Sequence, residues 1–215
     1  INNAPAFFDA FHGNYHLQIG SPCIDAGNNS YVTNLTYLDG NPRVVGGMVD
    51  IGAYEFQGKV RYVSLSSTNP IAPYSDWSIA ATNIQDAVDA ASGGDTVLVT
   101  NGVYATGGRP QADSGTNRVT LTKAITLKSA NGPAVTFIVG SQVAGTGLAL
   151  TNAVRCVQIG NAVLSGFTLT NGEAGTFNYP NGGGVNGSGG GTVTNCVLIG
   201  NLSTNGVGGG AYRTT

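Results

Sequence analysis

The sequence predicts an all-β fold, a solenoid of stacked parallel strands preceded by an irregular, loop-rich segment. Three observations lead to this prediction: short apolar runs alternate with turns, similar motifs recur along the chain, and charge is scarce. Charged residues make up 9% of the 215 residues, against about 25% in ordinary globular proteins. The 34 glycines follow no collagen period and alternate with Val, Ile, Leu and Thr runs, which indicates short strands joined by tight turns.

The composition disfavours two classes of function. The formal net charge is -2, and no basic stripe is present to neutralise phosphates, so we expect no nucleic-acid partner. No stretch of about 20 apolar residues occurs, so we expect no membrane span. The three cysteines, Cys23, Cys156 and Cys196, are too few and too scattered for a disulfide scaffold. We expect them to be buried as small apolar side chains, and the sequence leaves their disulfide state open.

Residues 1–57 are expected to be irregular, with short strands. Turn signals are dense there, as in Asp39-Gly40-Asn41-Pro42 and Gly46-Gly47, because Gly, Pro, Asn and Asp favour turn conformations. A strand pattern resumes at 59–63, so a boundary is expected near Gly58, and residues 58–94 are expected to hold a strand, a linker and a capping helix. The first residues show no signal-peptide pattern, so the chain starts either at a mature end or inside a longer protein.

One helix is predicted before the first coil. Thr82 and Gln85 have the spacing of a capping box. Gly93-Gly94 is predicted to end the helix, because glycine accepts the left-handed C-terminal conformation. One narrow apolar face is formed by small residues at helical spacing: Ile84, Ala87, Val88 and Ala91. Such a helix suits a lid on a flat surface.

Residues 95–215 are predicted to form the coils. The expected strands are 96–99, 119–121, 124–127, 136–139, 156–159, 166–169 and 193–199. Inward Val, Ile, Leu, Phe and Cys side chains are expected to fill the tube. Asn and Gly are expected at the bends, since both tolerate left-handed backbone and Asn can hydrogen-bond along a stack.

Recurring motifs support this solenoid. Cys156–Asn161 recurs as Cys196–Asn201, and Gly182-Gly183-Gly184 before Val185 recurs as Gly208-Gly209-Gly210 before Ala211. Phe167–Gly172 occupies the equivalent place one turn earlier. The spacing of about 25–30 residues lies in the range of solenoid repeats.

Two parts of the chain resemble known families. Ile84–Val99 with Gly102-Val103-Tyr104 resembles the N-terminal cap and first coil of pectate-lyase-like right-handed parallel β-helix proteins, and Ile125–Ser129 and Gly166–Gly172 resemble their coils. A second set of motifs resembles the segment that closes such helices in large bacterial surface proteins of the choice-of-anchor kind: Ser21–Asn28, Asp39–Arg43 and Val49–Glu55. The resemblance implies a right-handed, single-stranded β-helix in a secreted, extracellular or cell-surface protein.

The order of these parts implies a function. Residues 1–57 resemble the closing segment of an upstream unit, and residues 95–215 are expected to form coils open at the C-terminal end. Open strand edges are templates for another chain, and a contact that does not close produces a fibre. We therefore expect the protein to bind copies of itself head-to-tail, as a tandem array or a filament, in a structural or adhesive role.

The alternative is a carbohydrate-active or glycan-binding β-helix with a polysaccharide partner and a site outside this segment. Pectate lyases and polygalacturonases share the solenoid, and a glycoside hydrolase needs two carboxyls about 5 to 9.5 Å apart. Between Val97 and Thr215 the carboxylates are Asp113 and Glu173, both in turn-rich segments. The sequence therefore predicts no catalytic residues and no enzyme.

Calcium is the one cofactor that the sequence leads us to consider. Asp39, Asp50 and Glu55 are the candidates, because Ca²⁺ prefers several oxygen ligands supplied by loops; no other metal or cofactor site is predicted. His12 and His16 are four apart, but the Gly13-Asn14 turn between them argues against a helical metal pair. Both are expected to be structural or exposed.

Overall fold

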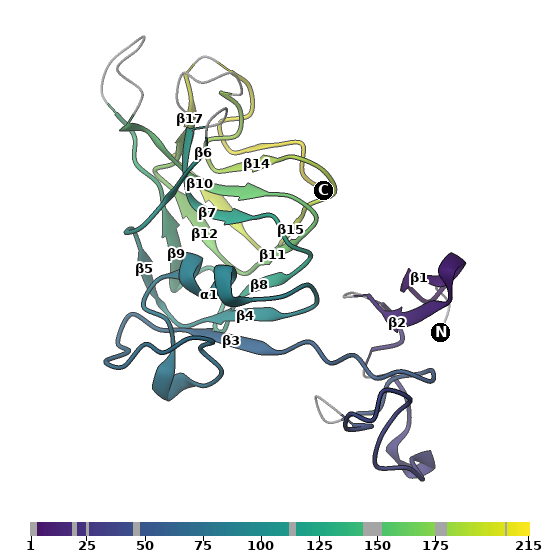
Figure 1. Cartoon of the computed structure of the whole chain (residues 1–215). Helices are drawn as coiled ribbons and strands as arrows, with labels where there is room; N and C mark the ends of the chain where they lie inside the picture. The colour runs from purple at the N-terminus through teal and green to yellow at the C-terminus, as the bar shows by residue number, and fades with distance from the viewer. Residues whose placement is uncertain are drawn as a thin grey trace. The chain divides into compact units, whose positions relative to one another are not determined.

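The computed structural model of the chain describes residues 4–18, 21–24, 26–44, 48–111, 115–143, 152–174, 180–204 and 206–215. Within these ranges the protein is mostly β, with parallel sheets and a single α-helix (Figure 1), so the predicted predominance of parallel β structure is confirmed. None of the helices in these ranges has both the length and the apolar character that a membrane crossing requires. The chain divides into two compact units, Ile1–Gly58 (unit 1) and Lys59–Thr215 (unit 2).

Unit 1 is built mainly from turns. Its regular elements are an antiparallel hairpin and two 3₁₀ helices: β1 (Phe7–Asp9), η1 (Ala10–His12), β2 (Asn14–Leu17) and η2 (Asn29–Tyr31). Asp9 caps η1 by accepting a hydrogen bond from the backbone N–H of His12. Gly13, with φ of +81°, ends η1 and turns the chain into β2, a conformation that glycine adopts without steric cost.

The strands of unit 2 form three main sheets. Sheet 1 contains β3 (Val60–Val63), β4 (Thr96–Val99), β8 (Thr126–Ser129), β11 (Val163–Ser165) and β15 (Thr192–Thr194). Sheet 2 contains β5 (Gly102–Tyr104), β9 (Thr136–Val139), β12 (Thr168–Thr170) and β16 (Val197–Ile199). Sheet 3 contains β6 (Arg109–Gln111), β7 (Gly115–Leu121), β10 (Val154–Ile159), β14 (Val185–Gly187) and β18 (Ala211–Tyr212). A small fourth sheet pairs β13 (Glu173–Ala174) with β17 (Leu202–Ser203).

The chain visits the three main sheets in a fixed order. From β4 onward it passes through sheets 1, 2 and 3 and then returns to sheet 1 beside the strand that it left (Figure 1). We call each such circuit a tier; the tiers are β4-β5-β7, β8-β9-β10, β11-β12-β14 and β15-β16-β18. Neighbouring tiers pair in parallel, whereas β6 pairs antiparallel with β7.

The core of unit 2 lies on the side of each sheet that faces the other two. In-register pairing puts like residues above one another, and the residues at these positions are fully or almost fully buried: Val97, Leu127 and Leu164 in sheet 1; Tyr104, Ile138 and Leu169 in sheet 2; Val119, Val157 and Val185 in sheet 3. They belong to one apolar cluster. A tier cannot bury this side by itself, so each tier depends on its neighbours for a dry interior.

The corners between sheets use the residues that the sequence indicated. Gly166, with φ of +84°, separates β11 from β12, and Asn195, with φ of +51°, separates β15 from β16 one tier later. The predicted continuous strand 193–199 is therefore wrong, because the left-handed backbone at Asn195 divides it. Asn201 accepts a hydrogen bond from the N–H of Gly172 at 2.9 Å and donates one to the C=O of Leu169 at 2.9 Å, which confirms the expected asparagine contacts between stacked bends.

The structure confirms the equivalence of the two glycine triplets but not that of the two Cys-led motifs. The residues after the two glycine triplets, Val185 and Ala211, are paired partners in sheet 3. The equivalence of the two Cys-led motifs is wrong: Val157 pairs with Val185 in sheet 3, whereas Val197 pairs with Thr168 in sheet 2. A short apolar strand followed by Gly-Asn is used at more than one corner, so local similarity does not identify the sheet.

The single α-helix, α1 (Ile84–Ala90), differs from its prediction at both ends. Asn83 rather than Thr82 is the N-cap, and its side chain accepts the N–H of Asp86 at 2.9 Å. At the other end Ala91 leaves the helix with extended backbone, so Gly93-Gly94 does not supply a left-handed cap. The predicted apolar face is confirmed, since its residues belong to the buried core cluster.

The buried positions give a first prediction. Replacing Leu164 by alanine should lower the free energy of unfolding by about 2–5 kcal/mol, because the surrounding tiers cannot collapse fully into the cavity. Urea denaturation of the purified chain measures the change. Ser165→Ala, on the same strand but facing away from the core, is the matched control and should cost less than about 1 kcal/mol. Equal losses would contradict a packed interior at Leu164.

Candidate functional site

The two ends of the strand stack in unit 2 differ in how their edges are covered. An edge strand presents unpaired N–H and C=O groups that can pair with another chain. The coverage of each end therefore indicates which surface can take part in assembly.

At the start of unit 2, residues 74–81 cover the outer edge of β3. The N–H of Tyr62 donates to the C=O of Tyr74 at 2.8 Å, and the N–H of Ala81 donates to the C=O of Tyr62 at 2.9 Å. The segment contains η3 (Trp77–Ile79), and the ring of Trp77 contacts that of Tyr62 with centroids 4.5 Å apart. The outward backbone groups of Tyr62, in the middle of β3, are thus satisfied within unit 2.

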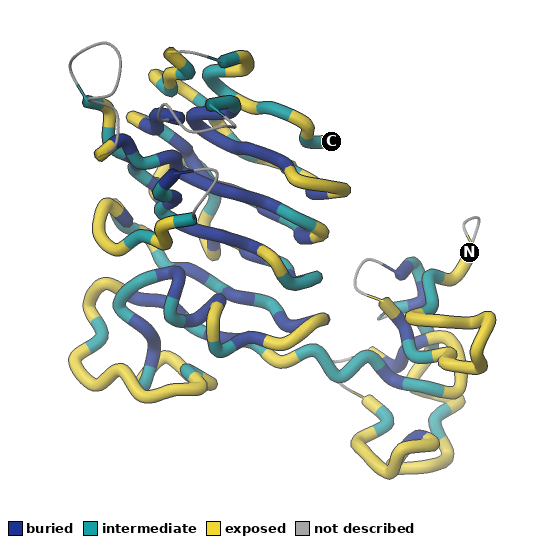
Figure 2. Tube along the Cα trace, turned by 45° about the horizontal axis from the view of Figure 1, so that its top comes forward, coloured by how far each residue is buried: buried dark blue, intermediate teal, exposed yellow. Residues whose placement is uncertain are grey.

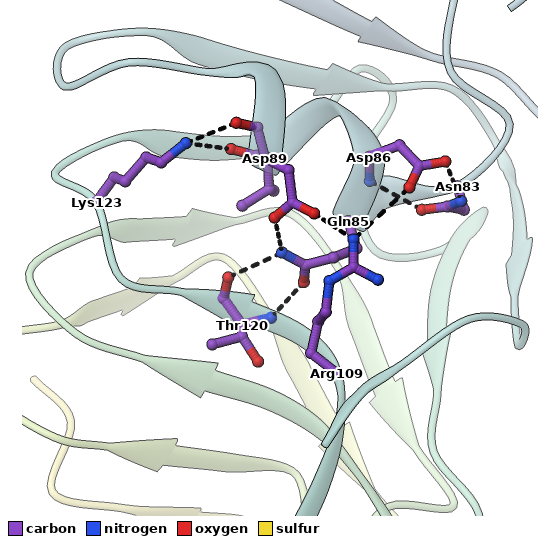
Figure 3. A network of polar contacts seen from close by, with 8 residues as sticks. Asn83, Gln85, Asp86, Asp89, Arg109, Thr120 and Lys123 are labelled. Carbon is purple, nitrogen blue, oxygen red and sulfur yellow. Dashed lines mark hydrogen bonds and ion pairs between the residues drawn. The ribbon is translucent and has the colours of Figure 1, made fainter. Parts of the chain in front are cut away.

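A side chain of α1 covers the exposed part of β7. Strand β6 pairs with the first residues of β7, up to Asn117. Beyond that point the Gln85 amide takes the place of a strand: its Oε1 accepts the N–H of Thr120 at 2.7 Å, and its Nε2 donates to the C=O of Thr120 at 3.3 Å (Figure 3). A primary amide offers the same donor and acceptor pair as a peptide group, so Gln85 completes the ladder at this edge.

Charged side chains hold α1 in this position. The Lys123 ammonium group donates to the last helix carbonyls, those of Val88, Asp89 and Ala91, at 3.2, 2.7 and 2.6 Å. A positive charge there is favourable because the carbonyl end of a helix carries partial negative charge. On the exposed side, Arg109 contacts Asp89 and lies 3.8 Å from Asp86 (Figure 3).

A buried ion pair connects the helix exit to β3. The Arg61 guanidinium donates to Asp95 Oδ2 at 3.0 Å, with both side chains almost fully buried. The same carboxylate accepts the N–H groups of Lys59 and Ser92, each at 2.9 Å. Because all these partners lie near the first strands, the contacts make the β3 end a closed structure.

The opposite end leaves core positions uncovered. Val193 pairs with Leu164 and Leu198 pairs with Leu169, yet both residues of this last tier are half-buried, whereas their partners are fully buried. Ala211, which pairs with buried Val185, is exposed. Figure 2 shows the contrast between the buried inner tiers and the largely exposed last one. In the described structure this end presents apolar interior to solvent.

The calcium candidates lie in unit 1 and make contacts of two kinds. Asp50 and Glu55 are buried together: Glu55 accepts the N–H of Asp50 at 3.0 Å, and Asp50 accepts the N–H of Phe56 at 2.5 Å. Asp39 instead accepts a hydrogen bond from His16 at 2.5 Å. The described residues contain no group of three or more His, Cys, Asp or Glu side chains that could hold a metal ion. Calcium binding stays a prediction that this geometry does not test.

The carboxylates considered for acid–base chemistry can be followed in one case. Glu173 is buried, and its two oxygens accept hydrogen bonds from the N–H of Val143 at 2.8 Å and the hydroxyl of Thr204 at 2.7 Å. These contacts connect β13 of the fourth sheet to Val143, which follows β9, and to Thr204, which follows β17. Asp113 lies outside the described residues.

All three cysteines are free in the structure. Cys23 and Cys156 are buried, as expected, whereas Cys196 is half-buried because it lies at the corner between β15 and β16 in the last tier. Burial raises the pKa of the Cys156 thiol to about 12, against weaker lowering by backbone hydrogen bonds. Burial also raises the pKa of Cys196.

Sequence reasoning missed two features of unit 2. Gln85 was given a role in the helix cap, although its spacing of four from Asp89, to which it donates at 2.7 Å, shows that both lie on the helix face toward sheet 3. The outward polar positions Gln158 and Asn186, both buried, received no role. They lie in β10 and β14, which are neighbours in sheet 3 but are separated along the chain by β11, β12 and β13, so no local pattern connects them.

Comparisons with protein-family models, curated proteins and solved structures found no match to this chain.

The edge contact of Gln85 gives a second prediction. Gln85→Met keeps the length of the side chain but removes the amide, which leaves the backbone groups of Thr120 unpaired. We expect a loss of about 1–3 kcal/mol in the free energy of unfolding and faster hydrogen exchange at the Thr120 amide. Ser92→Ala, at an exposed position just after α1, is the control and should leave this exchange unchanged. Unaltered protection of Thr120 in Gln85→Met would show that the amide does not complete the ladder.

The thiol of Cys156 gives a third prediction. Its pKa is higher in the folded protein than the value of about 8.5 in an unfolded chain, so above that pH the unfolded state loses a proton that the folded state keeps. Stability should therefore fall as pH rises from about 9 to 12, by at most about 1.4 kcal/mol per pH unit from this group. Cys156→Ala should flatten that decline in urea denaturation series at pH 8, 9, 10 and 11. Parallel declines in the two proteins would contradict it.

Proposed function

We propose that unit 2 is the capped start of a right-handed, single-stranded parallel β-helix of the pectate-lyase-like kind, and that the protein is an extracellular structural or adhesive module that assembles head-to-tail. The observation that carries this proposal is the in-register stacking of the tiers, which leaves Val193, Leu198 and Ala211 to be covered by a further apolar layer. Such a layer can come from a further tier or from another copy of the chain.

The strand connections support the β-helix part of the proposal. The tiers follow one another in parallel and in register, for example Val97 with Leu127 and Leu127 with Leu164. Connections between parallel strands of one sheet are right-handed in about 98% of cases. Right-handed winding is therefore the expected hand for these tiers.

The difference between the two ends supports an assembly with direction. At the β3 end, Gln85 and residues 74–81 pair with edge strands, whereas at the last tier Thr215 pairs with β15 through Val193 in the described structure. A last tier meeting a surface of another kind is a heterologous contact, and such contacts extend into filaments unless the rotation closes a ring.

Unit 1 of a second copy is the proposed occupant of the last tier. It exposes an unusual number of large apolar side chains for a segment of its size, among them Phe11 at 91% and Leu35 at 92% exposure. Two apolar surfaces on one chain, one in each unit, can cover each other between copies or between repeated units. Residues 1–57 also carry the motifs that resemble a closing segment.

The fourth prediction tests this assembly. Sedimentation of the 215-residue chain should show association that grows with concentration, and Cys196 should become protected from maleimide labelling over the same range, because a stacked partner covers the last tier. Ala211→Lys should abolish both effects by placing a charge at an inward position of the joint.

Thr194→Lys is the matched control, since Thr194 is exposed in the same tier and pairs with Ser165 on the outer side of sheet 1. It should leave association unchanged. A wild-type protein that stays monomeric at high concentration with freely labelled Cys196, or equal loss in both variants, would overturn the assembly proposal.

A further inference from the structure

Unit 2 contains several copies of a chemically reactive dipeptide, asparagine followed by glycine. In this dipeptide the backbone nitrogen of the glycine can approach the side-chain carbonyl carbon of the asparagine, because glycine has no β-carbon to hinder it. The sequence contains six such pairs, which begin at Asn101, Asn131, Asn171, Asn181, Asn186 and Asn205. Asn205 lies outside the described residues, and the other five pairs have different surroundings.

Space around the glycine distinguishes one pair from the other described pairs. A β-carbon built on Gly132 would meet no atom within 4 Å apart from its own chain neighbours. In each of the other four pairs the same β-carbon would clash with a neighbouring residue: Leu65 at Gly102, Gly183 at Gly172, Val185 at Gly182 and Arg213 at Gly187. Among the described pairs, the turn of Asn131 and Gly132 therefore has the most room for the asparagine side chain to rotate over the next nitrogen.

The hydrogen bonds of the glycine N–H groups differ in the same way. In three of the other pairs the N–H donates to a group in a distant part of the chain: Gly102 to the C=O of Val135, Gly172 to Asn201 Oδ1 and Gly182 to the C=O of Val207. The N–H of Gly132 instead donates to the hydroxyl of Ser129, three residues earlier, at 3.0 Å. Releasing it opens one local turn and leaves the pairing between tiers intact.

The Asn131 side chain is also accessible to water. It is exposed, and its Nδ2 donates to Asn101 Oδ1 at 2.7 Å. Asn101 is exposed as well, so these two asparagines differ in the surroundings of the following glycine and not in access to solvent. Asn186, by contrast, is only 6% exposed. Asn131 thus combines an accessible amide, an open turn and a locally held N–H.

We propose that Asn131 is a site of spontaneous deamidation. The Gly132 nitrogen gives its proton to hydroxide and attacks Asn131 Cγ. A C–N bond forms, the bond from Cγ to Nδ2 breaks, and Nδ2 leaves as ammonia with a proton taken from water. Water then opens the five-membered imide at either of its two C–N bonds, which gives aspartate or isoaspartate. The net change consumes one water and releases one ammonia, with no oxidation or reduction.

This reaction alters a contact between two tiers. Asn101 follows β4 and Asn131 follows β8, so their hydrogen bond joins the same corner in consecutive tiers. A carboxylate at position 131 accepts hydrogen bonds but has no N–H to donate to Asn101. Isoaspartate also adds one carbon to the main chain. The product therefore loses this contact and brings a negative charge to a corner that has none in either side chain.

The test is peptide mass mapping of the full 215-residue chain after incubation at neutral pH in water enriched in ¹⁸O. We expect Asn131 to convert first among the described pairs, to a mixture of aspartate and isoaspartate that carries solvent oxygen. Asn101 is the internal control, because it is exposed and has the same dipeptide. It should convert about tenfold or more slowly, since releasing the Gly102 N–H breaks a bond to the next tier.

Two further samples separate the folded geometry from the dipeptide itself. In urea, the unfolded chain should convert all the pairs at similar rates, because their folded surroundings are then absent. Asn131→Gln should stop conversion at this position, because its longer side chain would have to close a six-membered ring. The proposal is overturned if Asn131 converts no faster than Asn101 in the folded chain, if aspartate forms without isoaspartate, or if the folded and unfolded chains show the same order of rates.

Discussion

In-register stacking of parallel strands is the constraint on which the rest of unit 2 depends. Leu127 is excluded from solvent because Val97 and Leu164 lie on either side of it in the same sheet. Each inward position is covered by its neighbours in the same way. Neither hydrophobic burial nor backbone hydrogen bonding is complete within a single tier. Each outermost tier must therefore be covered, either by a further tier or by other residues. In the described structure one end is covered by α1 and residues 74–81, and the other shows its interior.

The closed end illustrates how few side chains are needed to cover an edge. Gln85 supplies one donor and one acceptor to Thr120, and the helix that carries it buries its apolar face in the core cluster. Lys123 then binds the carbonyl end of that helix. Because these contacts come from the helix, the first tier and the corner after it, the cap is part of the same cooperative unit as the strands. Removing any one of these contacts should therefore weaken the others.

Much of this architecture was predictable from sequence, and the failures have physical reasons. The short apolar runs, the glycine triplets at Gly182–Gly184 and Gly208–Gly210 and the apolar face of α1 each reflect a local rule that the fold obeys. The break at Asn195 was missed, because the apolar residues on both sides of it continue the pattern of a strand, and only the left-handed backbone at Asn195 divides it. The role of Gln85 was missed for a different reason. Its partner Thr120 is 35 residues away, and no periodicity within the helix reports such a contact.

The stacking constraint also separates the surfaces on which function can arise. Inward positions are fixed by burial, so variation there changes stability. Outward positions are free of that demand, yet Gln158 and Asn186 are buried polar residues on the outer side of sheet 3, where solvated Lys, Thr or Ser would satisfy the fold equally well. Polar burial without a full set of partners costs free energy, so the stability of the strand stack does not account for it.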